Sequence, residues 1–352
     1  MIKTRWFKAL IIILIVLILA AVAIFVAKIL KNKDGKIVET LGVLTEEEQP
    51  EEKKVQIYSG DKRPIAVMID NVKEAWPQAS INDAYIVYEI IVEGGETRLM
   101  ALFKNSDADV IGPIRSSRHY FLDYALENDA IYAHIGWSPQ AQRDISTLGV
   151  NNINGLYYDS GRARTDDAKY WRDTKRAAPH NCFSCISKLY EVAQSLGYRT
   201  TSTSESVLNY SVDEIELQSE TVANKVTIPY SSYTTVKFEY NAETKRYTKY
   251  AKNTKQTDAR TGEDITTKNI IITFAGNYTL TDAENKGRQG LKNIGTLDGY
   301  YITNGKSIPI KCIKNARNSQ TVYQDLEGNE IKVNDGNTFI QICPLNAKVV
   351  IE

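Results

Sequence analysis

Two glutamates precede a Gly-Gly pair and a glutamate and an arginine follow it, within a segment that runs from residue 85 to residue 104. The runs that flank Gly94-Gly95 are rich in Ile, Val, Tyr and Phe, so the segment is predicted to be a β-hairpin with a two-residue turn. Counting outward from that turn places Glu89 opposite Met100. Alternation of side chains then gives one apolar core face and one charged face, which carries Glu89, Glu93, Glu96 and Arg98.

Glutamates on such a face could act on a glycan. A carboxyl group whose pKa is raised by apolar surroundings can protonate a glycosidic oxygen as a general acid. Glu89 and Glu93 are about 13 Å apart along a strand, too far for the carboxylate pair of most glycosidases. The pattern therefore predicts an enzyme that cleaves cell-wall glycan with one catalytic glutamate, Glu89 or Glu93, as in lytic transglycosylases.

Two other interpretations need no catalysis. Arg98 is predicted to lie diagonal to both glutamates, and a nearby guanidinium lowers the pKa of a carboxyl group, which weakens a general acid. The same face then suits a receptor or scaffold that binds an anionic envelope polymer or a partner protein of unknown identity. The charges could also do no more than protect the hairpin from edge-to-edge aggregation.

Residues suited to anion recognition are concentrated in the first part of the chain. All three histidines and eight of the fifteen arginines lie between residues 98 and 180. Arginine can bind a carboxylate or phosphate through two parallel hydrogen bonds, which lysine cannot do. Besides the two glutamates, the residues predicted to bind a ligand are Asp70, Asn71, Arg98, Arg115, Arg118, His134, Arg176, His180 and Asn181.

Two short apolar runs are predicted to be strands that position some of these residues. The run at 64–70 ends in Asp70-Asn71 and is predicted to present both polar side chains at a strand end, a common ligand position. The run at 130–136 contains His134. We interpret this residue either as a hydrogen-bonded core histidine or as an acid/base residue at a strand end.

Helices and a polar loop are predicted to hold the remaining candidates. A helix at 119–128 would begin after Ser116 or Ser117, one of which is expected to cap it, and its free N–H groups would favour an anion. The segment 170–181 is dense in polar residues and is predicted to be a loop that lines the site. A second helix is predicted at 183–196 from its apolar spacing.

The second half of the chain is predicted to be mostly β, in a sandwich- or barrel-like arrangement. The fold class is therefore α+β, with a mixed α/β domain at 59–205 that carries the candidate site and a mostly β domain at 206–352. A polar Ser/Thr-rich stretch at 200–206 marks the predicted boundary. The predicted strands, separated by turn-forming residues, are 236–240, 247–250, 269–274, 307–312, 321–323, 330–333, 338–342 and 348–351.

The N-terminal segment predicts a membrane anchor. Residues 9–27 are an unbroken apolar run, and as a helix they would span about 28 Å, close to the roughly 30 Å of a bilayer core. Residues 1–8 are then a cytoplasmic tail and residues 28–58 a charged linker. Basic residues lie on both sides of the run, so charge alone leaves its orientation open.

Composition excludes some classes of partner. The formal net charge is zero, which argues against nucleic acid as the main partner. Cys182 and Cys185 have the spacing of half a metal site, but no second such pair follows, so neither a metal nor a cofactor is expected. Disulfides between these two cysteines and between Cys312 and Cys343 are expected only if the domain lies outside the cytoplasm.

Five motifs follow one another along the chain at residues 63–71, 84–98, 111–116, 134–136 and 176–181. Together they resemble the YerB-like lipoprotein family of Gram-positive bacteria, and the similarity extends over nearly all of residues 60–352. The resemblance implies a globular part outside the cytoplasm, held at the cell membrane, and no settled activity. This chain departs from the family because no cysteine precedes Cys182, so a single-pass helix replaces a lipidated cysteine. It also has Cys312 and Phe339 where the family often carries tryptophan.

Overall fold

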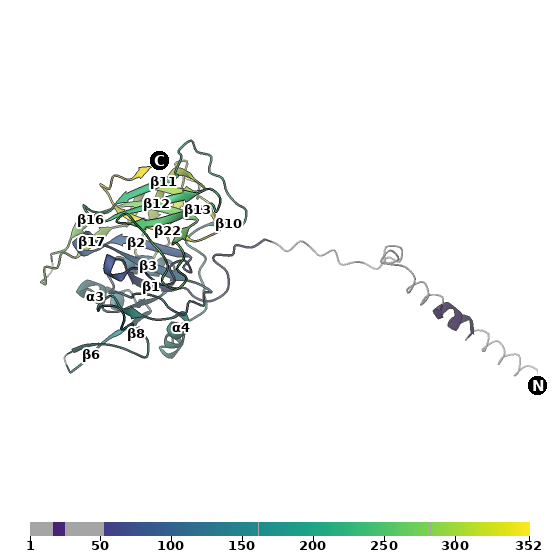
Figure 1. The fold of residues 1–352 in the computed structure, drawn as a ribbon, viewed down its shortest axis with the longest axis horizontal. Helices are drawn as coiled ribbons and strands as arrows, with labels where there is room; N and C mark the ends of the chain where they lie inside the picture. The colour runs from purple at the N-terminus through teal and green to yellow at the C-terminus, as the bar shows by residue number, and fades with distance from the viewer. Residues whose placement is uncertain (1–16, 25–52, 161, 282) are drawn as a thin grey trace, which may run out of the picture. The chain divides into compact units, whose positions relative to one another are not determined.

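Runs of β-branched and aromatic residues form the strands of this protein. The computed structural model describes residues 17–24, 53–160, 162–281 and 283–352, of which Lys54–Glu352 form one compact unit (Figure 1). The largest sheet in these ranges has eleven strands, with β17 (Gln289–Lys292) attached to β16. Its spatial order is β20 (Val322–Gln324), β19 (Lys306–Lys314), β18 (Gly295–Thr303), β16 (Asn269–Thr279), β22 (Thr338–Pro344), β2 (Ile86–Ile91), β3 (Thr97–Phe103), β1 (Ile65–Asp70), β4 (Ile131–His134) and β5 (Asn152–Asn154).

A second sheet and three small ribbons complete the β structure. The second sheet has the order β14 (Thr254–Lys255), β13 (Arg246–Ala251), β12 (Thr235–Asn241), β11 (Lys225–Pro229) and β23 (Val350–Ile351), with β15 (Thr266–Thr267) on β13. The ribbons pair β6 (Leu156–Asp159) with β7 (Arg162–Thr165), β8 (Trp171–Arg172) with β9 (Cys182–Phe183), and β10 (Tyr210–Ser211) with β21 (Val333–Asn334).

Short helices connect these strands. They are α2 (Phe121–Glu127), α3 (Pro139–Thr147), α4 (Ile186–Ser195) and the 3-10 turns η2 (Lys73–Ala75) and η3 (Glu93–Gly95). The mixed, mostly β character of the fold is thus confirmed. The predicted cap of the 119–128 helix is wrong, because α2 begins after Tyr120 without a side-chain cap, while Ser117 Oγ accepts a hydrogen bond from Tyr132.

The large sheet has a core on each of its faces. Val67 and Leu99 pack in one buried cluster and Met68 and Met100 in the other, and every residue of β1, β2 and β3 is buried. Strands covered on both faces read as continuous apolar runs, so a charged residue within them needs a partner inside the protein.

The central hairpin has a register different from the predicted one. Glu89 pairs with Leu99 rather than with Met100, because three residues, Glu93–Gly95, form the turn instead of two. Both glycines adopt positive φ, as a three-residue loop of this type requires. A shift of one residue moves side chains to the opposite face of the sheet, so the predicted charged face does not form. Glu89 lies on one face, and Arg98, which is opposite Ile90, lies on the other.

The two halves of the chain share the large sheet. β22 lies between β16 and β2 and runs parallel to both, so a strand near the end of the chain joins strands from before and after residue 205. Ion pairs among the described residues also connect the halves, with an acid of the first half bound to a base of the second. These pairs are Glu89–Lys249, Glu96–Lys252, Asp83–Arg260, Asp109–Arg260, Glu127–Lys314, Asp123–Arg317 and Asp144–Arg317.

The predicted N-terminal tail at 1–8 lies outside the described residues, as do most of the membrane helix at 9–27 and of the linker at 28–58. Residues 17–24 are helical. Within the described ranges, we find no helix with both the length and the apolar character needed to cross a bilayer. All four cysteines are free thiols.

Candidate anion-binding site

The carboxylate of Glu89 lies in the protein interior. Its side chain is 0% exposed, and Oε1 accepts hydrogen bonds from Asn71 Nδ2 at 3.0 Å and Thr97 Oγ1 at 2.8 Å. Lys249 Nζ and Gln341 Nε2 each lie 3.3 Å from Oε2. These five residues, which we call the interior network, bring together both halves of the chain. Each oxygen of Glu89 thus has partners inside the protein, which is what a buried charge requires.

Glu93, four residues along the same hairpin, lies at the protein surface. Arg118 holds it with two parallel hydrogen bonds, from Nε to Oε1 at 2.5 Å and from Nη2 to Oε2 at 2.9 Å. Burial raises the pKa of Glu93, but the bonds to Arg118 and the positive charges of Arg118 and Arg98 outweigh it, so the pKa lies below its usual 4.5. Glu93 is therefore an ionised carboxylate at neutral pH.

Two further arginines lie near this pair. Arg98 is opposite Asp70 in the β1–β3 pairing and donates from Nη1 to Ser116 O at 2.5 Å. Burial, followed by repulsion from Arg118 and Arg115, lowers the pKa of Arg98 to about 10. The guanidinium groups of Arg115 and Arg118 are therefore close enough to Arg98 to destabilise its charge.

Asp70 connects Arg115 to the polar loop. Its side chain is 1% exposed, and Oδ2 lies 3.0 Å from Arg115 Nε and 2.7 Å from His180 Nδ1. The buried Arg115 Nε makes no hydrogen bond in the described part of the chain, so its approach to Asp70 is an ion-pair contact with poor alignment. We name Arg98, Arg115 and Arg118, with the carboxylates of Asp70 and Glu93 and the ring of His180, the arginine cluster.

Backbone pairing at the end of β1 assembles this cluster. Asp70 N donates to Pro113 O and Arg115 N donates to Met68 O, so the segment before α2 runs beside the strand end. Gly112 permits that path, because its φ is 149° and a Cβ at this position would lie only 2.8 Å from Cys182 O, which leaves no room for a side chain. The strand-end position predicted for Asp70 is confirmed.

Other predicted site residues have partners within the fold. His134 is buried, with Nδ1 at 2.8 Å from Gly136 O and Nε2 at 3.2 Å from Asn152 Oδ1, and burial lowers its pKa to about 4. This geometry fits the core-histidine interpretation. Arg176 donates to the backbone oxygens of Ala75 and Pro77 at 3.0 and 2.8 Å and so holds the polar loop on the body.

Asn181 and Asn71 also join segments. Asn181 accepts a hydrogen bond from Arg172 Nη1 at 2.7 Å and donates to the backbone oxygens of Asp173 and Arg176. Asn71 belongs to the interior network. The structure therefore separates the predicted residues into the arginine cluster, the interior network and the braces of the polar loop.

Sequence reasoning missed Thr97, Lys249 and Gln341 of the interior network. A signal for Lys249 exists, because β13 alternates buried and half-buried residues and Lys249 occupies an inward position between Tyr247 and Ala251. Gln341 stands in a strand that is buried throughout and carries no comparable signal. In the described ranges, no group of three or more His, Cys, Asp or Glu side chains is arranged to hold a metal ion.

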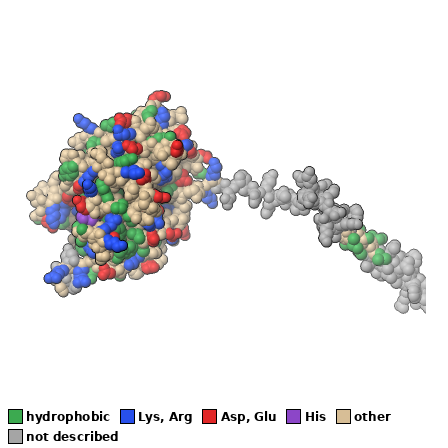
Figure 2. Space-filling view, in the orientation of Figure 1, with side chains coloured by type: hydrophobic (Ala, Val, Ile, Leu, Met, Phe, Trp, Pro, Cys, Tyr) green, Lys and Arg blue, Asp and Glu red, His purple; other side chains and the backbone are tan. Residues whose placement is uncertain are grey.

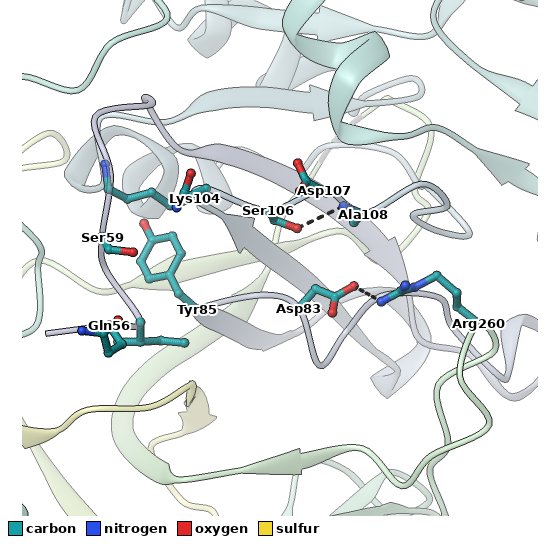
Figure 3. Close-up of a pocket in the computed structure, with 11 residues that line it drawn as sticks. Gln56, Ser59, Asp83, Tyr85, Lys104, Ser106, Asp107, Ala108 and Arg260 are labelled. Atoms are coloured by element: carbon teal, nitrogen blue, oxygen red, sulfur yellow. Dashed lines mark hydrogen bonds and ion pairs between the residues drawn. The ribbon is translucent and has the colours of Figure 1, made fainter.

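The visible face of the body mixes both signs of charge, with Lys and Arg side chains interspersed among Asp and Glu (Figure 2). A hollow of about 370 Å³ lies where β2 begins and β3 ends (Figure 3). Tyr85, Ser59 and Lys104 line it, and Arg260 lies at its edge in an ion pair with Asp83 at 2.5 Å. Two acidic residues, Asp83 and Asp107, and two basic residues, Lys104 and Arg260, line this hollow, so its charges balance.

Comparisons with known proteins agree with this architecture. Two family models match consecutive parts of the chain, "Protein of unknown function (DUF3048) N-terminal domain" at residues 45–199 and "Protein of unknown function (DUF3048) C-terminal domain" at residues 226–340. The chain is 26% identical over 294 residues to "Putative lipoprotein YerB" of Bacillus subtilis (strain 168), a match that covers 81% of this chain and 82% of that protein.

A solved structure leads to the same relative. The crystal structure of YerB protein from Bacillus subtilis matches with a TM-score of 0.71 at 25% identity, covering 85% of this chain and 97% of that one. The ordered motifs, the two domain matches and the shared fold lead to one conclusion. The chain is a homologue of YerB and belongs to the YerB-like family, with both the N-terminal and the C-terminal domain of DUF3048.

Proposed function

We propose that this protein is a membrane-anchored, extracytoplasmic protein of the cell envelope that binds an anionic wall polymer through the arginine cluster. One observation carries the proposal. Three guanidinium groups are gathered around only two carboxylates, and the pKa of Arg98 is lowered to about 10 by burial and by the other two arginines. A cluster with an excess of positive charge is stabilised when an anion binds.

The donors of the cluster suit a carboxylate or phosphate. Arginine recognises both groups through its planar fork, and partial burial strengthens such bonds relative to water. Arg115 is anchored through Nε to Asp70, and 24% of its side chain stays exposed, so its guanidinium can reach a ligand at this place. A carboxylate or phosphate on a wall polymer is therefore the ligand class that completes the cluster.

Binding suits this geometry better than glycan cleavage does. A general acid must hold its proton near neutral pH, whereas the pKa of Glu93 lies below 4.5 and Glu89 has no exposed surface. Neither Glu89 nor Glu93 is therefore both accessible and protonated near neutral pH, as the predicted lytic reaction would require.

The proposed location rests on two supports. The apolar run at 9–27 has the length of a membrane helix, and the Bacillus relative carries the word lipoprotein in its name. A lipid on that relative and a helix on this chain would serve the same purpose, holding a globular part at the outer face of the cell membrane.

Co-sedimentation tests the proposal. The full-length chain, purified in detergent, is mixed with Gram-positive cell walls, either untreated or stripped of phosphate-bearing polymers by hydrofluoric acid. We expect sedimentation with untreated walls, and an Arg115→Ala/Arg118→Ala variant is expected to bind at least about tenfold more weakly, a loss of about 1.4 kcal/mol. Arg143→Ala, which removes an exposed arginine of α3, is the matched control and should bind as wild type does.

The outcomes separate the alternatives. Loss of binding on stripped walls identifies phosphate as the anion, and retained binding identifies carboxylate. Wild-type binding by the double variant, or no binding by the wild type, overturns the proposal. Release of muropeptides that disappears in Glu93→Gln would favour the glycan-cleaving enzyme instead.

A further inference from the structure

A second cavity lies beside the polar loop. It has a volume of about 450 Å³ and is formed by the β8–β9 ribbon, the start of the loop and residues 259–260. Trp171 and Phe183 are cross-strand partners in this ribbon, so their rings lie on the same face and form an aromatic wall. We call this cavity the Trp171 pocket; its main lining residues are Trp171, Arg172, Thr174, Arg176, Phe183 and Arg260.

The three arginines of the pocket are held in place before any ligand arrives. Arg172 donates from Nε to Thr165 Oγ1 at 2.8 Å and from Nη1 to Asn181 Oδ1 at 2.7 Å, so two of its three guanidinium nitrogens already have partners. Arg260 is fixed at 2.5 Å from Asp83, as Figure 3 shows from the neighbouring hollow. Groups that are already ordered lose little conformational entropy on binding.

Arg176 joins the cations to the aromatic wall. Its guanidinium carbon lies 5.4 Å from the centre of the Phe183 ring, within the range of a cation–π contact, and its two terminal nitrogens donate to the backbone. Asp173 is the one carboxylate among the described residues that line the pocket. Asp83 and Asp109 pair with Arg260, and Asp173 lies 3.6 Å from Arg176. Arg172 is therefore the one cation of this lining that has no ion pair among the described residues.

We infer that the Trp171 pocket binds one sugar unit that carries an anionic substituent, either a carboxylate or a phosphate. Its volume lies within the roughly 300–1,000 Å³ of small-molecule sites. The half-buried Trp171 ring suits the apolar face of a pyranose ring, the Thr174 hydroxyl suits its hydroxyl groups, and the unpaired guanidinium of Arg172 suits the anion. The inference rests on the proposed function and deepens it, because Arg176 and His180 of one loop connect this pocket to the arginine cluster, so that successive units of one polymer would occupy both.

Calorimetry with three monosaccharides tests the inference. The full-length chain in detergent is titrated with N-acetylmuramic acid, with N-acetylglucosamine 6-phosphate and with neutral N-acetylglucosamine. The first two differ from the third by one carboxylate-bearing or phosphate-bearing group. We expect one or both anionic sugars to bind at least about tenfold more tightly than the neutral sugar, and the tighter of the two identifies the anion.

Variants locate that binding. Arg172→Gln is expected to reduce the preference for an anionic sugar to less than about threefold, and Trp171→Ala to weaken binding of every sugar, with near-ultraviolet circular dichroism confirming that both variants are folded. Trp171→Phe retains an aromatic ring and should bind within about threefold of wild type, which keeps the test valid if Trp171→Ala misfolds. Arg143→Gln is the matched control and should change nothing.

Each remaining outcome overturns the inference. Equal binding of the neutral and anionic sugars contradicts a site for an anion, and unchanged binding by Arg172→Gln and Trp171→Ala contradicts the location. If no monosaccharide binds while walls still sediment the chain through the arginine cluster, the pocket inference fails and the proposed function stands. If the walls fail to bind as well, the proposed function fails with it.

Discussion

Glu89 and Glu93 stand four residues apart in one hairpin, and their surroundings are opposite in kind. Glu89 is enclosed by a lysine, two amides and a hydroxyl, so that its acceptors are matched by donors in the interior. Glu93 is held by Arg118 within a group that has more cationic donors than carboxylates. A balanced set of donors and acceptors stabilises a fold, whereas an unbalanced set at the surface has capacity left for a ligand.

The largest effect is expected from breaking the interior network. Lys249→Met leaves the carboxylate of Glu89 buried without its cation, and we expect the free energy of unfolding to fall by about 3–5 kcal/mol, measured by urea denaturation of the full-length chain. Lys252→Met removes a cation from a half-exposed pair with Glu96 and is the matched control, with an expected loss below about 1 kcal/mol.

The double variant Glu89→Gln/Lys249→Met sharpens this result. With both charges removed, no charge remains unpaired, so the loss should be smaller than that of Lys249→Met alone. If Lys249→Met lowers the free energy of unfolding no more than Lys252→Met does, the ion pair between Glu89 and Lys249 is no more important for stability than the half-exposed pair between Glu96 and Lys252.

The next effect is a pH dependence from buried histidines. Burial lowers the pKa of His134 and of His119 to about 4 from 6.5, so the unfolded chain binds more protons than the folded chain between these values. Stability should therefore be greatest above pH 6.5 and fall as the pH decreases toward about 4. In His134→Gln the slope of unfolding free energy against pH should be about half that of wild type, and an unchanged slope would refute this assignment.

A smaller effect, on binding rather than folding, is expected at the surface. Arg118→Ala should weaken wall binding about tenfold while lowering the free energy of unfolding by less than about 1 kcal/mol, because the pair with Glu93 is partly exposed. Parallel sedimentation and urea experiments measure both quantities. A large loss of stability with unchanged binding would show that Arg118 stabilises the fold, as the interior network does. Glu89 and Glu93 would then not differ in role.

The smallest effect concerns Glu93 itself. Its folded pKa lies below its usual 4.5, so the pairing stabilises the protein above that pH and is lost as the pH falls through the folded value. The difference in unfolding free energy between wild type and Glu93→Gln should be constant above about pH 5.5 and shrink below pH 4.5. A difference that grows on acidification would mean that Glu93 is protonated in the folded protein.

Much of the fold could be predicted from local sequence. The run before Asp70 and most of the longer strands of the second half are β-branched and bounded by turn residues, so periodicity was enough to locate them. β11 and β18 were not predicted. The hairpin register was not predictable in the same way. Gly94-Gly95 suits a two-residue and a three-residue loop equally well, and one residue decides which face Glu89 occupies.

The composition of the candidate site was only partly accessible. The abundance of arginine near Asp70 and the hairpin indicated an anion site, and Arg98, Arg115 and Arg118 do gather there. Lys249 lies 160 positions from Glu89 in the sequence, so only the pairing of distant strands reveals their contact. The kind of chemistry that individual residues support could be predicted from the sequence, whereas contacts between residues far apart in the chain could not.

The position of β22 constrains when the protein can fold. This strand, Thr338–Pro344, ends eight residues before the C-terminus and occupies the middle of the large sheet, where it joins β2 to β16. A chain that is synthesised from its N-terminus cannot complete this sheet until β22 has emerged. Until then β2 and β16 each lack a neighbour along one edge, and a chain cut before Thr338 would lose the strand that both halves share.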